Sequence, residues 1–299
     1  MNPISVCGRA GARGPVSSTG LPRAYVDVTC HGDGSSWLES RPVICERELT
    51  VAANGVELVR LLCSGMALRE LAHGFLYSEG VIRGLGDVLR CSVDASAMEA
   101  SFDLTVPVRR PGCPTMSSGF GGKVLRSPLT GGALGRRGAV DADELRGRRA
   151  HVPGEEGAGL GEVLRSESFK TGVFSIGEIF LAMTAMDHAA VEYHATRGMH
   201  CSALFRGGEM LGCFEDIGRH NTFDKLAGHC LLSEISPEGT LLATTGRVSA
   251  EMCAKALRLG VAAVASCSGP TDAAVRLARE AGVMLVGYAG KPGRAVRYA

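Results

Sequence analysis

A regular alternation of short apolar runs and helical patterns between residues 240 and 288 constrains the fold of this chain more than any other feature. Each helical pattern is followed at once by glycine, at Gly260 and Gly282, as helix C-termini prefer. The apolar runs lie at 240–243, 261–266 and 283–288, and the helical patterns at 248–259 and 271–281. This β-α-β-α-β order predicts parallel strands, right-handed crossovers and helices packed against the sheet.

The segment just upstream extends the same domain. Helical patterns at 172–195 and 222–230 flank two strand-like runs, at 201–205 and 210–214, which are typical of a hairpin. The expected fold class is therefore α/β, with this larger domain in the C-terminal half of the chain.

A smaller unit is expected nearer the N-terminus. Asn54-Gly55 separates two strand-like runs, at 51–54 and 55–61, and a helical pattern follows at 67–77. The chain then divides into a disordered tail at 1–24, a small α+β domain at 25–110, a flexible Gly/Arg-rich loop and linker at 111–170, and a ligand-binding α/β domain at 171–299.

Composition excludes several classes of protein. Lys and Arg (32) nearly balance Asp and Glu (31), so binding to nucleic acid through bulk charge is not expected. No run of 18 apolar residues predicts a membrane helix, and residues 1–24 lack the apolar core of a signal peptide. Together with an odd count of 11 cysteines, this indicates reduced thiols and a cytoplasmic location.

Residues 109–149 are rich in glycine and basic. Nine Lys and Arg against three Asp and Glu give the segment a charge of +6. Such a segment is too polar to build a core of its own. Two interpretations stay open, a solvated linker and a mobile loop that docks an acidic partner or a phosphate.

Polar and basic residues follow the predicted strands, at the edge where open α/β sheets bind ligands. Arg219, Arg247, Lys291 and Arg294 supply positive charge suited to phosphate, beside glycines and helix N-termini. Four such segments favour a phosphorylated ligand. The alternative is that Asp216–Arg219 and Asp224–Lys225 ion pairs only fix turns.

His220 lies in the first of these segments. It is a candidate general acid or base, or a helix cap. No Cys-x-x-Cys and no His-Glu-x-x-His occurs, so no metal site is expected.

The residues Glu215-Asp216-Ile217-Gly218-Arg219-His220-Asn221, followed by Asp224-Lys225, resemble the signature of the formate dehydrogenase accessory sulfurtransferase family, FdhD/NarQ. Further segments fall in the family's order over about residues 41–299. These are 48–51 with Asn54-Gly55, 70–76, 196–200, 246–252 and 291–294.

The resemblance implies a small N-terminal domain joined to a cytidine-deaminase-like, three-layer α/β domain, and homodimers in the cytoplasm. It implies that a loop cysteine takes sulfur as a persulfide from a cysteine desulfurase. The sulfur then passes to molybdenum bis(molybdopterin guanine dinucleotide), which is inserted into formate dehydrogenase or a related molybdoenzyme.

The strand-end chemistry and the resemblance together give one set of candidate residues for binding this cofactor. They are Asp216, Arg219, His220, Asn221, Asp224, Lys225, Gly246, Arg247, Ser249, Tyr288, Ala289, Gly290, Lys291, Pro292, Gly293 and Arg294.

The sequence departs from the family at one position. Phe120 stands where the resemblance places the persulfide cysteine, and a phenyl ring cannot carry sulfur. Cys113, seven residues upstream, is the nearest thiol, and Arg109 and Arg110 would favour its thiolate. Cys113 is therefore the candidate catalytic residue. The alternatives are that Cys113 is an ordinary thiol, and that the protein is a non-sulfurating, cofactor-binding chaperone for a molybdenum or tungsten enzyme.

Overall fold

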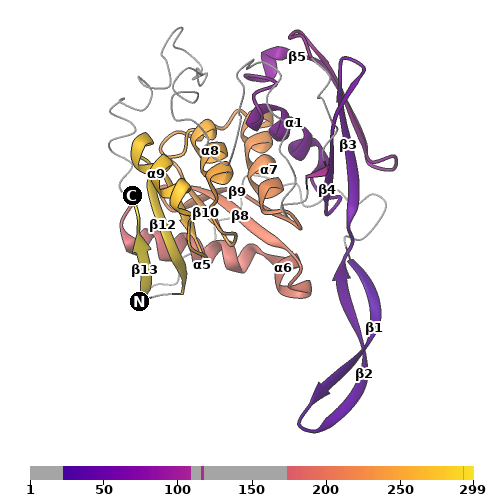
Figure 1. Ribbon diagram of the computed structural model, residues 1–299, viewed down its shortest axis with the longest axis vertical. Coiled ribbons are helices and arrows are strands. Elements are labelled where there is room, and N and C mark those ends of the chain that lie inside the picture. Colours follow the sequence, from indigo (N-terminus) through magenta and orange to yellow (C-terminus); the bar gives the residue numbers. More distant parts are fainter. Residues whose placement is uncertain (1–22, 109–115, 118–173, 292) are drawn as a thin grey trace.

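The computed structural model describes residues 23–108, 116–117, 174–291 and 293–299, which form two packed domains and a projecting hairpin (Figure 1). The predictions on Cys113, Phe120 and Pro292 fall outside the described residues, as does most of the predicted linker at 111–170. No helix among the described residues is long and apolar enough to cross a membrane.

The N-terminal domain is a five-stranded sheet, in the order β5-β6-β3-β4-β7, with helix α1 against it. Its elements are β3 (Arg47–Ala53), β4 (Val56–Cys63), α1 (Leu68–Ser78), the 3-10 turn η1 (Leu85–Asp87), β5 (Val88–Asp94), β6 (Glu99–Leu104) and β7 (Met116–Ser117). Asn54 and Gly55 have φ of 50° and 75°, as a two-residue hairpin turn requires. The predicted hairpin and the helix after it are confirmed.

The C-terminal domain has three layers. Its six-stranded sheet has the order β13-β12-β11-β10-β8-β9, and β10, β11 and β12 are parallel. The strands are β8 (His200–Arg206), β9 (Glu209–Asp216), β10 (Leu241–Thr244), β11 (Ala263–Ser266), β12 (Met284–Lys291) and β13 (Arg294–Arg297). The predicted α/β class, with a three-layer domain beside a smaller α+β domain, is confirmed.

Helices cover both faces of this sheet. One core joins the sheet to α7 (Arg219–Leu232), α8 (Ala250–Leu259) and α9 (Asp272–Ala281). A second core joins the opposite face to α5 (Ile176–Ala189). The helix predicted at 172–195 is interrupted at Ala190, after which α6 (Val191–Thr196) begins.

The two domains meet where α1 crosses α7 (Figure 1). A Cβ atom added to Gly74 would lie 1.6 Å from the carbonyl oxygen of Asp224, and one added to Gly228 would lie 1.9 Å from that of Glu70. The two helix backbones are therefore in direct contact, which only glycine allows.

The hairpin of β1 (Arg23–Gly32) and β2 (Ser35–Ile44), here called the arm, projects from the body of the molecule (Figure 1). It was not predicted, because both of its faces are largely exposed and its residues lack the alternation of a half-buried strand. Arg23 and Ala24 belong to β1, so the predicted end of the tail lies two residues inside this strand.

Candidate functional site

Strand β9 ends at Asp216, and helix α7 begins three residues later at Arg219, with Gly218 as its N-cap residue. The segment 215–225 thus turns from the edge strand of the sheet into the helix that contacts the N-terminal domain. Its side chains divide between two environments, one buried between the domains and one at the carboxyl ends of the parallel strands.

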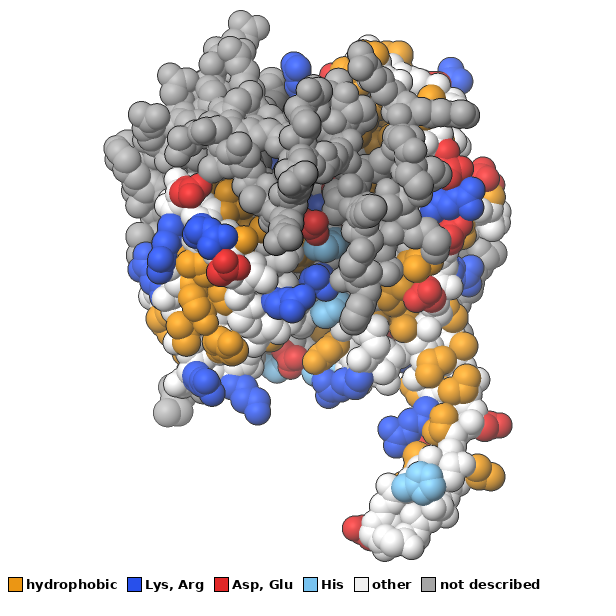
Figure 2. All heavy atoms as spheres, viewed as in Figure 1, with side chains coloured by type: hydrophobic (Ala, Val, Ile, Leu, Met, Phe, Trp, Pro, Cys, Tyr) orange, Lys and Arg blue, Asp and Glu red, His pale blue; other side chains and the backbone are white. Residues whose placement is uncertain are grey.

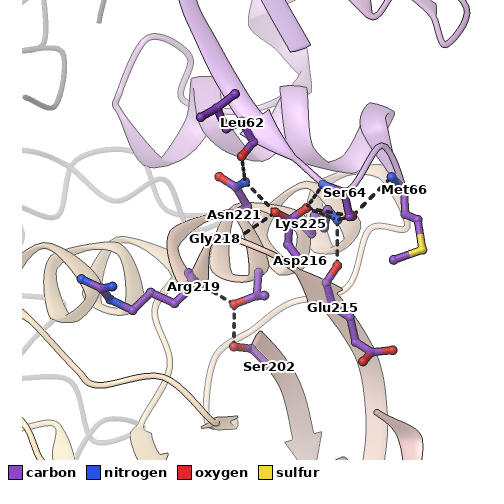
Figure 3. A network of polar contacts seen from close by, with 11 residues as sticks. Leu62, Ser64, Met66, Ser202, Glu215, Asp216, Gly218, Arg219, Asn221 and Lys225 are labelled. Atoms are coloured by element: carbon purple, nitrogen blue, oxygen red, sulfur yellow. Dashed lines mark hydrogen bonds and ion pairs between the residues drawn. The ribbon is translucent and has the colours of Figure 1, made fainter. Parts of the chain in front are cut away.

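The buried environment is the Asp216 network, formed by Asp216, Lys225, Ser64 and Asn221 (Figure 3). The Lys225 Nζ lies 2.6 Å from the Asp216 carboxylate, and both side chains are 0% exposed. Asp216 also accepts hydrogen bonds from the Ser64 hydroxyl and from the Asn221 amide. This ion pair is fully desolvated and fully partnered.

The same network ties α7 to the end of β4. Asn221 donates to the carbonyl of Leu62, and Lys225 donates to the Ser64 hydroxyl and to the carbonyl of Glu215. Because Leu62 and Ser64 belong to the N-terminal domain, these bonds cross the interface between the domains.

Asp224 lies in a second ion cluster. Its two carboxylate oxygens both accept from the Lys255 Nζ at 2.7 Å, and Glu79 of the N-terminal domain lies 3.3 Å from the same nitrogen. This cluster therefore joins α7, α8 and the end of α1.

These contacts correct four of the candidate cofactor-binding residues. Asp216, Asn221, Asp224 and Lys225 are buried and committed to protein partners, so they offer no accessible surface to a ligand. The sequence analysis also offered structural ion pairs as an alternative. Both aspartates do form ion pairs, but with other partners than the predicted ones. Asp216 pairs with Lys225, and Asp224 pairs with Lys255, which was not singled out from the sequence.

The second environment is the strand-end face, formed by Arg219, His220, Gly246, Arg247, Glu251, Tyr288 and Arg294. The side chain of Arg219 packs against Gly246, where an added Cβ would lie 2.9 Å from the Arg219 Cβ. Burial and the nearby charge of Arg247 lower the pKa of the Arg219 guanidinium, and Glu251 opposes this. Two cations thus lie close together, an arrangement that an anionic ligand would stabilise.

His220 contributes an unsatisfied polar atom to this face. The residue is 8% exposed, and its buried Nε2 makes no hydrogen bond to any described residue, although Glu251 Oε2 lies 3.7 Å away. Burial, helped by the charges of Lys255 and Arg219, lowers its pKa to about 3. His220 is therefore neutral at pH 7, and its Nε2 is a buried polar atom without a hydrogen bond in the described part of the chain.

The ends of β10, β11 and β12 are linked by hydrogen bonds. Ser266 donates to the carbonyl of Gly246, Ser268 donates to that of Thr245, and the Tyr288 amide donates to that of Ser268. These hydrogen bonds connect the strand-end segments from Gly246 to Tyr288, so the cationic residues near Gly246 and the Tyr288 ring lie along the same edge of the sheet.

Tyr288 and Arg294 form the other end of the strand-end face. The guanidinium carbon of Arg294 lies 5.6 Å from the centre of the exposed Tyr288 ring. Gly269 lies against this ring, since an added Cβ would lie 2.7 Å from the Tyr288 hydroxyl oxygen. An aromatic ring with a stacked guanidinium can support a planar ligand such as a nucleobase.

The other predicted cofactor-binding residues on this edge differ in their exposure and in their contacts. Ser249 caps α8 by accepting from the Met252 amide, and Ala289 is buried in the core beneath α5. Gly290, Lys291 and Gly293 are exposed at the β12–β13 turn, and an added Cβ on Gly290 would lie 3.0 Å from the Cys267 Sγ.

The described cysteines that could compete with Cys113 are held in unfavourable surroundings. Burial raises the pKa of Cys253 to about 12, and the pKa of Cys267 is also raised by burial. Cys201 and Cys213 lie with their sulfur atoms 3.4 Å apart, and this contact, with burial, raises the pKa of Cys201. In the described part of the chain, no three His, Cys, Asp or Glu side chains gather as a metal site.

Comparison with known proteins places this geometry in a family. The model of the FdhD/NarQ family matches residues 44–128 and 135–298. The chain belongs to the FdhD/NarQ family. The first matched range includes Ser64 of the Asp216 network, and the second includes the segment 215–225 and the residues of the strand-end face.

Individual relatives agree with this assignment. The sulfur carrier protein FdhD of Bacillus licheniformis is 33% identical over 82% of this chain and 83% of its own. The sulfur carrier protein FdhD of Bacillus subtilis strain 168 is 31% identical, over 89% of this chain and 91% of the length of that relative. A crystal structure described as a candidate formate dehydrogenase accessory protein from Desulfotalea psychrophila has the same fold, with a TM-score of 0.65, 19% identity, and coverage of 93% of this chain and 96% of that one.

Three residues around the site escaped the sequence reasoning. Ser64 lies 152 residues before Asp216 in the chain, and no local pattern connects them. Glu251 lies within a segment that resembles the family, yet it received no role. His200, at the start of β8, is partly buried, and its pKa is lowered by burial and by the charge of Arg219.

Proposed function

We propose that the protein is a sulfur carrier required for formate dehydrogenase activity. It would take sulfur from a cysteine desulfurase and pass it to molybdenum bis(molybdopterin guanine dinucleotide), its substrate. Family membership and the similarity to sulfur carrier proteins FdhD support the sulfur-carrying role. The strand-end face supports the choice of substrate.

One observation carries the binding half of this proposal. Among the described residues, the buried Nε2 of His220 has no hydrogen-bond partner, and the charge of Arg219, which itself lies near Arg247, acts on this ring. A buried polar atom without a partner costs about 1–3 kcal/mol, which a bound ligand would recover. Phosphate oxygens fit the two guanidinium groups, and a guanine base fits the ring of Tyr288.

The sulfur step assigned to Cys113 is a simple exchange. The Cys113 thiolate would attack the outer sulfur of the desulfurase persulfide, forming a new S–S bond and releasing the desulfurase cysteine as a thiolate. No external oxidant is needed, because the sulfur atom transferred keeps its oxidation state.

The test combines binding and mass measurement on the full chain. GDP is titrated into the protein by calorimetry, and the protein is separately incubated with a cysteine desulfurase and cysteine. We expect GDP to bind and Cys113 to gain 32 Da in a peptide map. A chain that neither binds GDP nor carries sulfur on Cys113 contradicts the proposal.

A second candidate is a chaperone that binds the cofactor without sulfurating it, and Phe120 favours it. The sulfur carrier and the chaperone predict different outcomes for one variant. A Cys113→Ala variant that still supports formate dehydrogenase activity in cells favours the chaperone, whereas loss of activity favours the sulfur carrier. A molybdenum or tungsten enzyme and a second copy of the chain are proposed partners of either function, and a cysteine desulfurase is a proposed partner of the sulfur carrier alone.

A further inference from the structure

Two cysteines lie in contact on neighbouring strands of the C-terminal sheet. The Sγ atoms of Cys201 on β8 and Cys213 on β9 are 3.4 Å apart, and both thiols are free. In the antiparallel register, Cys201 lies opposite Glu215 and Cys213 lies opposite Ala203. The two cysteines are therefore diagonal neighbours on one face of the sheet. The proposed sulfur transfer through Cys113 uses neither of them.

The pair is close to the geometry of a disulfide bond. Its sulfur atoms would have to approach by about 1.4 Å to reach the S–S bond length of about 2.0 Å. The short contact shows that the two side chains already point toward each other. Rotation of these side chains, with a small shift of the strands, would therefore close the bond.

The two thiols differ in their access to solvent. Cys201 is fully buried, whereas Cys213 is partly exposed. The contact with Cys213, together with burial, raises the pKa of Cys201, so Cys201 is a poor nucleophile as long as both cysteines are thiols. A reagent from solution would therefore react with Cys213 first, and Cys201 would react second.

Cys201 also lies next to the strand-end face. Its strand, β8, lies between β9 and β10 in the sheet. The Cys201 amide donates to the Thr245 hydroxyl, and the Cys201 carbonyl accepts from the Thr245 amide, both at 3.0 Å. Thr245 directly precedes Gly246 and Arg247 of the strand-end face. A bond that draws Cys201 toward β9 would therefore pull it away from Thr245.

We propose that Cys201 and Cys213 are a redox-active pair, which a low-molecular-weight disulfide oxidises to an intramolecular disulfide, and that this bond loosens Thr245 beside the strand-end face. Glutathione disulfide is an oxidant of this class. An excess of a small thiol reverses the reaction.

The reaction consists of two successive thiol–disulfide exchanges. The Cys213 thiolate attacks one sulfur of glutathione disulfide, which forms a mixed disulfide and releases one glutathione thiolate. Cys201 then gives up its proton to that thiolate and attacks the sulfur of Cys213, releasing the second glutathione. The cysteine pair loses one electron pair, and this pair reduces glutathione disulfide to its two thiols.

The test incubates the reduced full chain with glutathione disulfide and maps its cysteines by mass spectrometry. We expect a disulfide between the peptides of Cys201 and Cys213. In Cys201→Ser the reaction should stop with one glutathione on Cys213, whereas Cys213→Ser should leave Cys201 as a free thiol.

Cys30→Ser is the matched control and should keep the disulfide. Cys30 is also partly exposed, but its Sγ contacts the Glu39 carboxylate. It belongs to β1 of the arm, which projects from the body of the molecule in the space-filling view (Figure 2).

Hydrogen exchange tests the effect on the neighbouring segment. Mass spectrometry follows exchange in the peptide that contains Thr245, before and after oxidation. We expect oxidation to speed exchange of the Thr245 amide about tenfold in the wild type, because its hydrogen bond to the Cys201 carbonyl is weakened. The rate should stay unchanged in Cys201→Ser, which cannot form the bond.

Two results would overturn the inference: an oxidised wild type without a Cys201–Cys213 disulfide, or a disulfide that leaves exchange at Thr245 unchanged. Circular dichroism verifies that each serine variant is folded, and the wild-type map remains a test if a variant does not fold. Neither readout needs a nucleotide. Failure of the proposed function would instead be seen as a reduced wild type that neither binds GDP nor carries sulfur on Cys113.

Discussion

The Asp216 network and the strand-end face share one segment, residues 215–225, but place its charged groups in opposite environments. In the network, each charge has its counter-charge and water is excluded. On the face, two arginines lie near one another and the buried Nε2 of His220 is left without a hydrogen bond. The difference teaches that one family motif can hold the packing of two domains beside the face that we propose binds a ligand.

Helical geometry explains the division. Asn221 and Lys225 are four residues apart on α7, and both point toward the N-terminal domain (Figure 3). Arg219 and His220, in the first turn, lie at the carboxyl ends of the strands. A single change should therefore affect either stability or binding, according to the side of α7 it alters.

The largest expected effect comes from breaking the network. Lys225→Met leaves the Asp216 carboxylate buried without its counter-charge, which should cost about 3–5 kcal/mol of unfolding free energy. Urea denaturation measures it. Arg276→Ala, which breaks the exposed pair with Asp272, is the control and should cost less than about 0.5 kcal/mol. A loss below about 1 kcal/mol in Lys225→Met would show that the network is not a stabilising unit.

The next effect concerns the contact between the domains. Gly228→Ala places a methyl group 1.9 Å from the Glu70 carbonyl oxygen, so α1 and α7 must separate. We expect a loss of about 1–3 kcal/mol in thermal or urea unfolding. Gly86→Ala, where an added Cβ meets nothing within 4 Å, should change stability little. Equal effects of the two substitutions would argue against a close crossing.

A smaller effect follows from His220. Because its pKa is lowered to about 3 in the folded chain, stability is complete above the unfolded pKa near 6.5 and is lost as pH falls toward 3. Between pH 7 and 4.5, His220→Gln should lose about 2 kcal/mol less stability than the wild type. The measurement is urea unfolding at a series of pH values. Identical pH profiles would mean that His220 is not held neutral by burial.

Much of the fold could be predicted from the sequence. The parallel strands at 240–288 alternate with helices whose apolar sides are distinct, and their caps at Gly260 and Gly282 were correctly placed. The arm could not be predicted, because its surroundings in the single chain give it no buried side. The break at Ala190 between α5 and α6 also carries no clear local signal.

The sequence predicted which residues lie near the strand ends better than it predicted the surroundings of each side chain. Arg219, His220, Gly246 and Arg247 do meet at the strand ends, as residues that follow strands of one sheet should. Asp216 and Lys225 looked equally suited to a ligand, since a polar residue in a motif does not show which side of a helix it faces. Ser64, which decides their role, comes from another domain.

The central claim is that the strand-end face, and not the Asp216 network, binds the guanine nucleotide. It is tested most directly by calorimetric titration of GDP into the wild type, Arg247→Ala and the control Arg276→Ala. We predict that the wild type and Arg276→Ala bind equally, while Arg247→Ala binds about 10- to 100-fold more weakly, as loss of a charged hydrogen bond would cause. Unchanged affinity in Arg247→Ala would contradict the account.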